Sequence, residues 1–406
     1  MMSFVLLPLY TDLLPTQEYG KVSIIFAWIV VFNVILAYGM ETAFFRFYHD
    51  DKTKSSVKGT SALSIAISSI IFLGLALYLK SHLASLINID VKYITFVIWI
   101  LVLDALVIIP FSILRAKGKS MLYSILKIVN VAINLGLNVF FLVILKDLIN
   151  PSKEVFWNSI WFSGAEVSYI FISNLIASLL TLLMLVPLYF KIKLRINFSL
   201  LKKMLRFGFP VMIAGLAYAV NETFDRILLD YLLPSETAES QIGAYAACYK
   251  LALFITLFAT AFRLGIEPFF FSHSKEKNSQ ETYALITKYF VLIGLGILLS
   301  VIVFIDVLKE LFIRDESYWE AMTVVPYILL ANLCLGIYFN LSVWYKITDR
   351  TKFGAYFSIV GALVTLALNF WLIPSIGYKG SAIATLSAYG TMMILSWYFG
   401  KKHYPI

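Results

Sequence analysis

Four charged side chains interrupt two apolar runs in the second half of the chain. Glu222, Asp225 and Arg226 fall inside one run, and Lys250 falls inside the next. A charge at the centre of a membrane helix costs about 2.5–3.5 kcal/mol on insertion scales, so such residues normally face a partner or a wet cavity. Asn221 and Asp225 are four residues apart, as are Glu222 and Arg226, so each pair meets on one helical turn.

Two interpretations of these charges are open. In the first, the pairs Glu222–Arg226 and Asp225–Lys250 neutralise each other and pin a helical hairpin. In the second, the side chains bind a ligand or handle protons. Arg226 and Lys250 lie eight and seven residues from the two ends of the turn between the runs. Both are therefore expected about 10–12 Å below the same membrane surface, where they would face one another or line one cavity.

Further charges lie within or beside other apolar runs. Asp104 is near the middle of one run. It is interpreted either as a proton or cation site or as the partner of a basic residue on a neighbouring helix. Arg46 and Glu41 flank the inner end of a second run, and Arg263 and Glu267 flank that of a third. Solvated helix ends explain such residues. Alternatively, the arginines grip a phosphate, because the guanidinium fork matches phosphate oxygens.

Polar side chains also recur at helical spacing. Lys127, Asn130, Asn134 and Asn138 form a stripe along one run. Asparagine holds membrane helices together through hydrogen bonds worth about 0.6–2 kcal/mol. That role is favoured for Asn138, whereas Asn130 and Asn134, together with Asn221, are candidates to line a hydrophilic path.

The elements that position these residues are membrane helices. Of the 406 residues, 60% are hydrophobic and 14% are charged, and the mean hydropathy is +0.85. Soluble domains carry about 25% charged residues. Apolar runs of about 20 residues predict transmembrane helices. The expected spans are 21–40, 60–79, 93–113, 121–145, 169–190, 210–233, 244–268, 284–305, 321–344, 353–374 and 381–399. Met1 to Tyr10 is interpreted as the outer end of an incomplete first helix, which gives about twelve helices.

Loop charges predict the orientation. One alternating set of loops holds 20 Lys and Arg residues, and the opposite set holds 7. Since basic residues gather in cytoplasmic loops, the C-terminus and the basic link 191–209 are expected in the cytoplasm. The net charge of +9 is assigned to this bias rather than to nucleic-acid binding.

The chain also repeats itself weakly. Pro15 matches Pro234 and Gly20 matches Gly243, at offsets of 219 and 223. Residues 117–123 match 350–356, and 137–140 match 368–371, at offsets of 233 and 231. Each offset spans six helices, so the two halves share one orientation in the membrane. The sequence therefore predicts an all-α membrane protein with two parallel six-helix bundles: 1–190, then the link 191–209, then 210–406.

Motifs for other chemistries are missing from the sequence. It has no P-loop and no His-Glu-x-x-His, and its four histidines are scattered. Cys248 and Cys334 lie far apart inside apolar runs, so neither a disulfide framework nor a metal site is predicted. No cofactor is implied. A transporter of this kind would be driven by an ion gradient or by its substrate gradient.

Several local patterns extend over essentially the whole chain. They are Leu-Pro-Leu-Tyr-Thr-Asp-Leu-Leu-Pro-Thr-Gln-Glu-Tyr-Gly (7–20), Gly-Met-Glu-Thr-Ala-Phe-Phe-Arg-Phe (39–47), Asp-Arg-Ile-Leu-Leu (225–229), Gly-Ala-Tyr (243–245), Tyr-Lys (249–250) and Leu-Asn-x-x-Leu-Ile-Pro…Gly-x-x-Gly-Ser-Ala-Ile-Ala-Thr (368–385). In their order and spacing these patterns resemble the polysaccharide-unit (Wzx-type) flippases of the multidrug/oligosaccharidyl-lipid/polysaccharide exporter superfamily.

The resemblance implies a non-enzymatic, multi-pass protein of the bacterial inner membrane. Such a protein flips undecaprenyl-diphosphate-linked oligosaccharide, of the O-antigen, capsule or exopolysaccharide type, to the outer leaflet. Association with polysaccharide assembly machinery is possible. A basic cavity between two rocking bundles would shield the headgroup. Its expected diphosphate-binding cations are Arg46, Arg226, Lys250 and Arg263. Its expected acids, for charge pairing or for coupling to H⁺ or Na⁺, are Asp104, Glu222 and Asp225.

Other classes share parts of this pattern. An ion-coupled drug or cation antiporter of the same superfamily would have the same architecture but a cavity of net negative charge. A sugar-porter-type major facilitator also has two parallel six-helix halves, but its Gly-x-x-x-Asp-Arg/Lys loop is absent from 41–58. A membrane-embedded polysaccharide polymerase normally has a large outer loop, and no loop here is expected to exceed about 23 residues.

Overall fold

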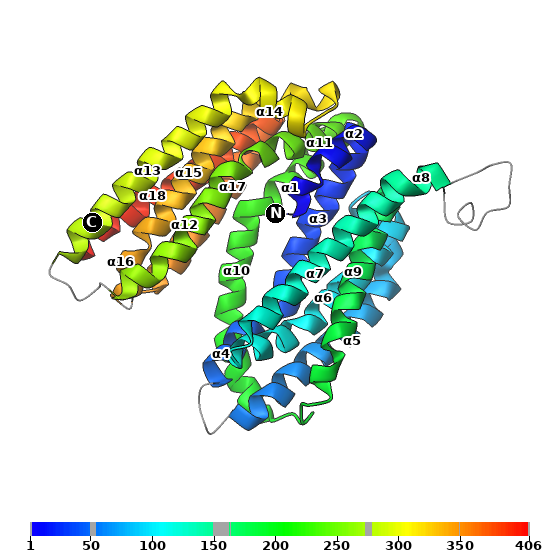
Figure 1. Ribbon diagram of the computed structural model, residues 1–406, viewed down its shortest axis with the longest axis vertical. Coiled ribbons are helices and arrows are strands. Elements are labelled where there is room, and N and C mark those ends of the chain that lie inside the picture. Colours follow the sequence, from blue (N-terminus) through cyan, green and yellow to red (C-terminus); the bar gives the residue numbers. More distant parts are fainter. Residues whose placement is uncertain are drawn as a thin grey trace. The chain divides into compact units, whose positions relative to one another are not determined.

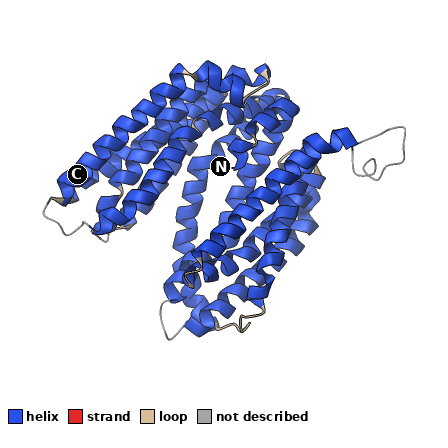
Figure 2. Cartoon of the chain, in the orientation of Figure 1, coloured by secondary structure: helices blue, strands red, loops and turns tan. Residues whose placement is uncertain are grey.

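A computed structural model describes residues 2–48, 54–148, 162, 164–272, 278–348 and 350–404. Nearly all of them lie in helices, and no strand occurs among them (Figure 2). In chain order (Figure 1) the helices are α1 Met2–Val5, α2 Leu7–Leu13, α3 Thr16–Ala37, α4 Met40–Tyr48, α5 Lys54–Leu86, α6 Val91–Ala116, α7 Ser120–Val139, the π-helix η1 Phe140–Ile144, α8 Leu145–Leu148, α9 Glu166–Tyr189, α10 Phe198–Leu232, α11 Ser235–Leu251, α12 Leu253–Ser272, α13 Ser279–Val303, α14 Ile305–Phe312, the 3-10 helix η3 Glu316–Val324, α15 Val325–Leu341, α16 Val343–Ile347, α17 Lys352–Ile376 and α18 Tyr378–His403.

The described residues contain ten helices long and apolar enough to cross a membrane. An eleventh candidate is α11 together with α12, a pair bent by 45° at its break. These candidates coincide with the eleven complete spans predicted from the sequence. The first predicted segment corresponds to α1 and α2, which have four and seven residues. The prediction of an all-α, multi-pass membrane protein is confirmed.

Contacts divide the chain into two compact units. The second-half unit consists of Ser3–Ala27 and Ala217–Ile406, and the first-half unit consists of Trp28–Leu216. Both borders fall inside long helices, α3 and α10, and not in the basic link. The units therefore differ from the predicted bundle boundaries, because the first 25 or so residues of the chain pack with the second half.

Helix α6 is the centre of the first-half unit. It packs against α4, α5, α7 and α9, and 78% of its most apolar 18-residue window is buried. A helix that is hydrophobic all round is expected to be enclosed in this way. Because Asp104 lies near the middle of α6, this packing places a carboxylate inside the unit.

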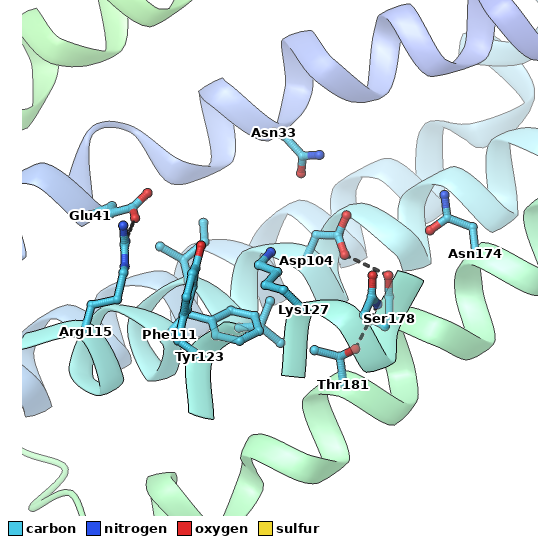
Figure 3. Close-up of a pocket in the computed structure, with 13 residues that line it drawn as sticks. Asn33, Glu41, Asp104, Phe111, Arg115, Tyr123, Lys127, Asn174, Ser178 and Thr181 are labelled. Carbon is cyan, nitrogen blue, oxygen red and sulfur yellow. Dashed lines mark hydrogen bonds and ion pairs between the residues drawn. The ribbon is translucent and has the colours of Figure 1, made fainter. Parts of the chain in front are cut away.

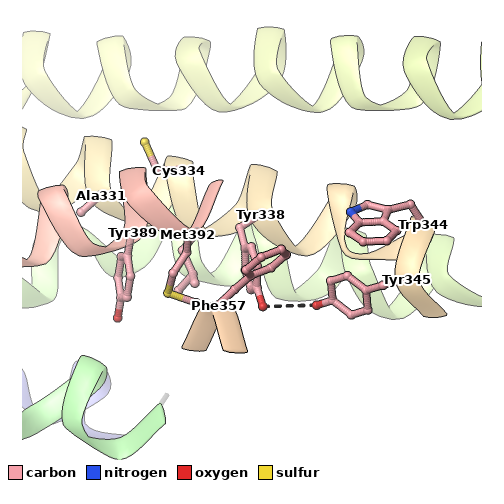
Figure 4. Close-up of a cluster of buried hydrophobic side chains, with 9 residues drawn as sticks. Ala331, Cys334, Tyr338, Trp344, Tyr345, Phe357, Tyr389 and Met392 are labelled. Atoms are coloured by element: carbon pink, nitrogen blue, oxygen red, sulfur yellow. Dashed lines mark hydrogen bonds between the residues drawn. The ribbon is translucent and has the colours of Figure 1, made fainter. Parts of the chain in front are cut away.

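Helix α15 has the corresponding place in the second-half unit, where it packs against α12, α13 and α18. A buried cluster joins α15 to α16, α17 and α18 and includes Tyr338, Trp344, Phe357 and Tyr389 (Figure 4). Trp344 Nε1 donates to the carbonyl of Ser396 at 3.0 Å. The cluster fixes the position of Tyr389, which matters for the site described below.

Two matched segments of the predicted repeat cross each other within the second-half unit. A Cβ on Gly20 would lie 1.8 Å from the carbonyl oxygen of Glu239, and one on Gly243 would lie 1.9 Å from that of Thr16. The same offset, 223 residues, relates Thr16 to Glu239 and Gly20 to Gly243. The Oγ1 of Thr16 and the Oγ of Ser240 are 2.7 Å apart. Small residues that let backbones approach closely are typical of membrane helix crossings. The crossing supports the repeat.

A second matched pair, Asn138 on α7 and Asn369 on α17, has the same local bonding. The Nδ2 of Asn138 donates to the carbonyl of Asn134 at 2.8 Å, and the Nδ2 of Asn369 donates to that of Thr365 at 2.7 Å. Both asparagines are fully buried. Ser381 of α18 donates to Asn369 Oδ1 at 2.6 Å, which joins two helices. This geometry supports the architectural role predicted for these positions.

Candidate functional site

Helices α10 and α11 of the second-half unit hold a buried ion pair. Arg226 Nη1 lies 3.1 Å from Asp225 Oδ1, and the other carboxylate oxygen of Asp225 accepts a 2.6 Å hydrogen bond from the hydroxyl of Tyr245. The side chains of Arg226 and Asp225 are 12% and 5% exposed. The guanidinium also lies over the ring of Tyr249, 4.8 Å from its centroid. The α10–α11 hairpin therefore encloses Arg226 with a carboxylate and two aromatic rings.

Glu222, one turn earlier on α10, has a different partner. Its Oε1 accepts a 2.7 Å hydrogen bond from the hydroxyl of Tyr389 on α18. That hydroxyl also lies 3.1 Å from the backbone carbonyl of Asn221. Among the described ion pairs Arg226 is paired with Asp225 and not with Glu222, whose carboxylate accepts from α18 instead.

Lys250 has neither an ion pair nor a hydrogen bond from its side chain among the residues that the structure describes. Asp225, the partner considered for Lys250, is instead bonded to Arg226 and Tyr245, one through each carboxylate oxygen. Lys250 is half-buried near the end of α11, just before the chain bends into α12. It is a basic group inside a membrane helix without an ion-pair partner in the described ranges.

Asn221 joins α10 to α17. Its Nδ2 donates to the carbonyl of Ser358 at 3.2 Å, and its Oδ1 accepts from Thr365 at 2.8 Å. The side chain is buried and its donor and acceptor are both used. This bonding is what a helix-joining asparagine requires. The part predicted for Asn221 in a polar path stays a prediction.

The other two predicted cations each lie over an aromatic ring. Arg46 of α4 lies 4.4 Å from the ring centroid of Phe207 in the first-half unit. Arg263 of α12 lies 4.6 Å from that of Phe339 in the second-half unit. Within the described ranges neither arginine has a carboxylate partner. The side chain of Glu267, the acid expected near Arg263, lies outside what the structure describes. Stacking leaves the edge of a guanidinium free to donate hydrogen bonds.

A polar cavity of about 370 Å³ lies within the first-half unit (Figure 3). Asp104 of α6 and Lys127 of α7 both line it. Asp104 Oδ1 accepts a 2.8 Å hydrogen bond from Ser178 of α9, and the Lys127 ammonium lies 4.6 Å from the ring centroid of Phe111. Asp104 was predicted to be either a proton or cation site or the partner of a basic residue. Lys127 is a basic residue in the same cavity lining, and both roles stay predictions.

A second pair of opposite charges lines the same cavity. Arg115, at the end of α6, forms an ion pair with Glu41 of α4. Its guanidinium also lies over the rings of Phe45 and Tyr123, 4.8 and 5.2 Å from their centroids. The Nε of Arg115 is buried without a hydrogen-bond partner among the described residues. The cavity thus contains two cations and two carboxylates.

The asparagines of α7 divide between cavity and core. Asn130 lines the cavity, and its Nδ2 donates to the carbonyl of Ala177 at 3.1 Å and to Thr181 Oγ1 at 2.8 Å. Asn134 is buried and its Oδ1 accepts from Asn138 at 2.7 Å. The prediction that Asn130 lines a hydrophilic path is supported by its place in the cavity lining. Asn134 instead bonds to Asn138 on the same helix.

Sequence reasoning overlooked several cavity residues. Arg115 had been assigned to a cytoplasmic loop by its position, and Asn33 lies alone in an apolar run. A signal was available on α9, where Asn174, Ser178 and Thr181 follow helical spacing. The other predicted residues do not share this cavity: Arg46 is outside its lining, and Arg226, Lys250 and Arg263 belong to the second-half unit.

Two family models match the chain. The family model described as polysaccharide biosynthesis protein matches residues 1–262, and the MatE model matches residues 210–371. No protein of curated function matches the chain in sequence.

Solved structures share the fold at low identity. An inward-facing multidrug resistance MATE family transporter of the MOP superfamily has a TM-score of 0.77 and 14% identity, over 99% of this chain and 94% of that one. The lipid II flippase MurJ, in an inward closed conformation, has a TM-score of 0.78 and 14% identity, over 98% of this chain and 85% of that one. A MOP superfamily transporter from Pyrococcus furiosus has a TM-score of 0.66 and 15% identity, over 98% of this chain and 90% of that one. Since the first family model covers well over half of the chain, the chain belongs to the polysaccharide biosynthesis protein family and has the fold of the multidrug/oligosaccharidyl-lipid/polysaccharide exporter (MOP) superfamily of transporters.

Proposed function

We propose that the chain is a flippase for oligosaccharide units linked to undecaprenyl diphosphate, of the O-antigen, capsule or exopolysaccharide type. Membership of the polysaccharide biosynthesis protein family supports this substrate class. The fold shared with the lipid II flippase MurJ agrees with a lipid-linked substrate. The substrate's sugars and diphosphate cannot cross hydrocarbon unaided, so a protein that moves them must supply a polar, positively charged route.

One observation carries the proposal. Lys250, Arg46 and Arg263 lack a carboxylate partner within the described part of the chain, whereas Glu222 and Asp225 each accept strong hydrogen bonds. An uncompensated ammonium in a membrane helix is costly, and an anionic ligand removes that cost. Cations without a carboxylate partner can bind an anion, whereas carboxylates that already accept hydrogen bonds are less available to a cation. This arrangement therefore suits a diphosphate better than a cationic drug.

In the proposed mechanism, Arg46, Arg226, Lys250 and Arg263 attract the diphosphate, and the polyprenyl tail stays in lipid. Rocking of the two halves then alternates access between the leaflets. Asp104, Glu222 and Asp225 balance the cations or couple their movement to H⁺ or Na⁺, and the polar path consists of Asn130, Asn134 and Asn221. Arginine suits diphosphate because its planar fork makes two parallel hydrogen bonds.

The proposal places the chain in the bacterial inner membrane with its C-terminus in the cytoplasm. The 20-to-7 bias of basic residues between the two sets of loops supports that orientation. It also places the protein beside the enzymes that assemble the glycan, as partners that supply and use its substrate.

The alternative is an ion-coupled drug or cation antiporter, and one specific observation favours it. The first-half cavity contains Asp104 and Glu41, and an acid in a polar cavity can exchange a proton for a cationic substrate. The match to the MatE model over residues 210–371 agrees with this alternative. A polysaccharide polymerase is the weakest of the three candidates.

A variant series tests the flippase. In a strain without the native protein, Lys250→Ala at wild-type abundance should reduce surface glycan about 10–100-fold, because a hydrogen bond to a charged group is worth about 1.5–3 kcal/mol. Lipid-linked units should then accumulate in the inner leaflet. Lys250→Arg should retain export.

The matched control is Lys309→Ala. Lys309 is already paired, with its Nζ 2.6 Å from Asp306 and 4.5 Å from the ring centroid of Trp319. Normal export in Lys250→Ala and Arg263→Ala alike would remove these cations from the mechanism. Unchanged glycan combined with lost resistance to cationic drugs in Asp104→Asn would favour the antiporter.

A further inference from the structure

A groove of about 540 Å³ lies on the second-half unit, away from the charges described above. Its floor is α15, with Ile337 and Leu341, and its two walls are α13 and α18. Helix α15 packs against both wall helices. The volume falls within the about 300–1,000 Å³ typical of small-molecule sites. Apart from Thr287 and Lys288, the lining is apolar.

Lys288 is the one charged residue in the lining of this groove. It lies nine residues after the start of α13, which is about 13 Å along a helix that crosses the membrane. Its side chain is exposed, and it has no ion pair or hydrogen bond among the residues described. A cation at this depth on a membrane-facing helix normally has an anionic partner or reaches toward the membrane surface.

A second cation lies outside the lining but next to one of its residues. Lys401 of α18 lies 5.7 Å from the ring centroid of Trp397, which lines the groove. The start of α13 is joined to the end of α18 by a 2.8 Å hydrogen bond between the hydroxyls of Ser279 and Tyr404. Lys401 is therefore close to the membrane surface, and Trp397 lies one turn deeper. Tryptophan favours this headgroup level.

The rest of the groove faces hydrocarbon. Leu292 on one wall and Ile394 on the other are 53% and 57% exposed, in helices that cross the membrane. Val291 and Met393 line the groove behind them. An occupant must therefore be apolar along most of its length and anionic at one end. That combination excludes free phosphate and describes a phospholipid.

We propose that this groove binds one anionic phospholipid, with an acyl chain between α13 and α18 over α15 and its phosphate between Lys288 and Lys401. Basic pockets between membrane helices are known to bind anionic headgroups on the cytoplasmic side. With the C-terminus in the cytoplasm, this lipid comes from the inner leaflet. The site goes beyond the proposed transport function, because none of the proposed substrate-binding residues takes part.

Native mass spectrometry of the full-length protein, titrated with phosphatidylglycerol or phosphatidylcholine, tests this assignment. Wild-type protein should bind phosphatidylglycerol more tightly. Lys288→Gln should weaken phosphatidylglycerol binding about fivefold, from the ~1 kcal/mol contributed by each basic residue near an anionic lipid surface. Phosphatidylcholine binding should change little. Lys288→Arg should bind as the wild type does, and the control Lys402→Gln removes a neighbouring exposed charge outside the lining.

A second variant fills the groove without changing its charge. Ala284→Phe, in the lining of α13, should weaken the binding of both lipids, whereas the control Leu285→Phe, exposed beside it, should not. Equal phosphatidylglycerol affinity in Lys288→Gln and Lys402→Gln would overturn the proposal. A dimer that dissociates in Ala284→Phe would also overturn it, since a second copy of the chain would then be the occupant.

Discussion

The ion pair between Arg226 and Asp225 should stabilise the second-half unit, whatever its part in transport. Both side chains are nearly buried, and within the described part of the chain the further side-chain partner of Asp225 is the hydroxyl of Tyr245. Arg226→Ala would leave the carboxylate buried without its cation. Removing one partner of a buried pair costs about 3–5 kcal/mol. Lys250→Ala removes a charge that has no ion-pair or hydrogen-bond partner among the described residues, so it should not lower the free energy of unfolding.

Unfolding can be followed with a thiol-reactive fluorophore, because Cys248 and Cys334 are both buried and free. The midpoint for Arg226→Ala should fall well below that of the wild type, and the midpoint for Lys250→Ala should not. The double variant Asp225→Asn/Arg226→Gln should be more stable than Arg226→Ala, since no lone charge is left. A midpoint for Arg226→Ala equal to that of the wild type would refute the pairing inferred from the structure.

Other variants test the helix contacts, with the same fluorophore as the readout. Gly243→Ala should lower the unfolding midpoint, because its Cβ would lie 1.9 Å from the Thr16 carbonyl oxygen, whereas Gly296→Ala, which meets open space, should not. Asn130→Ala should cost about 0.6–2 kcal/mol through its lost bonds to α9. Glu41→Gln should destabilise more than Asp90→Asn, since it removes the ion-pair partner of Arg115, whose Nε is already buried without a hydrogen bond among the described residues. Equal midpoints within any of these comparisons would contradict its contact.

Most of the helices could be predicted from local sequence. Twenty apolar residues span a bilayer whatever their neighbours are, so length and hydropathy were sufficient for eleven spans. The repeat was also visible, and the crossing of Gly20 with Gly243 supports it. The border between the two compact units was not predictable, because it falls inside α3 and α10, where hydropathy does not change.

The candidate site divides in the same way. The residue types were evident from the sequence: charges inside apolar runs, and asparagines at helical spacing along α7. Their partners were not, because partner choice depends on the rotation of each helix about its axis. Spacing allowed Arg226 to meet Glu222, yet Glu222 accepts a hydrogen bond from Tyr389 of α18, and Arg226 pairs with its neighbour Asp225 on the same helix. Tyr245 and Tyr389, which occupy the two carboxylates, carry no local signal at all.

Sequence alone thus determined that the chain crosses the membrane many times, that its halves are related, and which rare charges the membrane must accommodate. These properties depend on the cost of placing polar groups in hydrocarbon, which each residue carries with it. Only the tertiary structure decided which charges are paired and which have no ion-pair partner among the described residues. That outcome depends on contacts between helices more than 100 residues apart, such as α10 with α18.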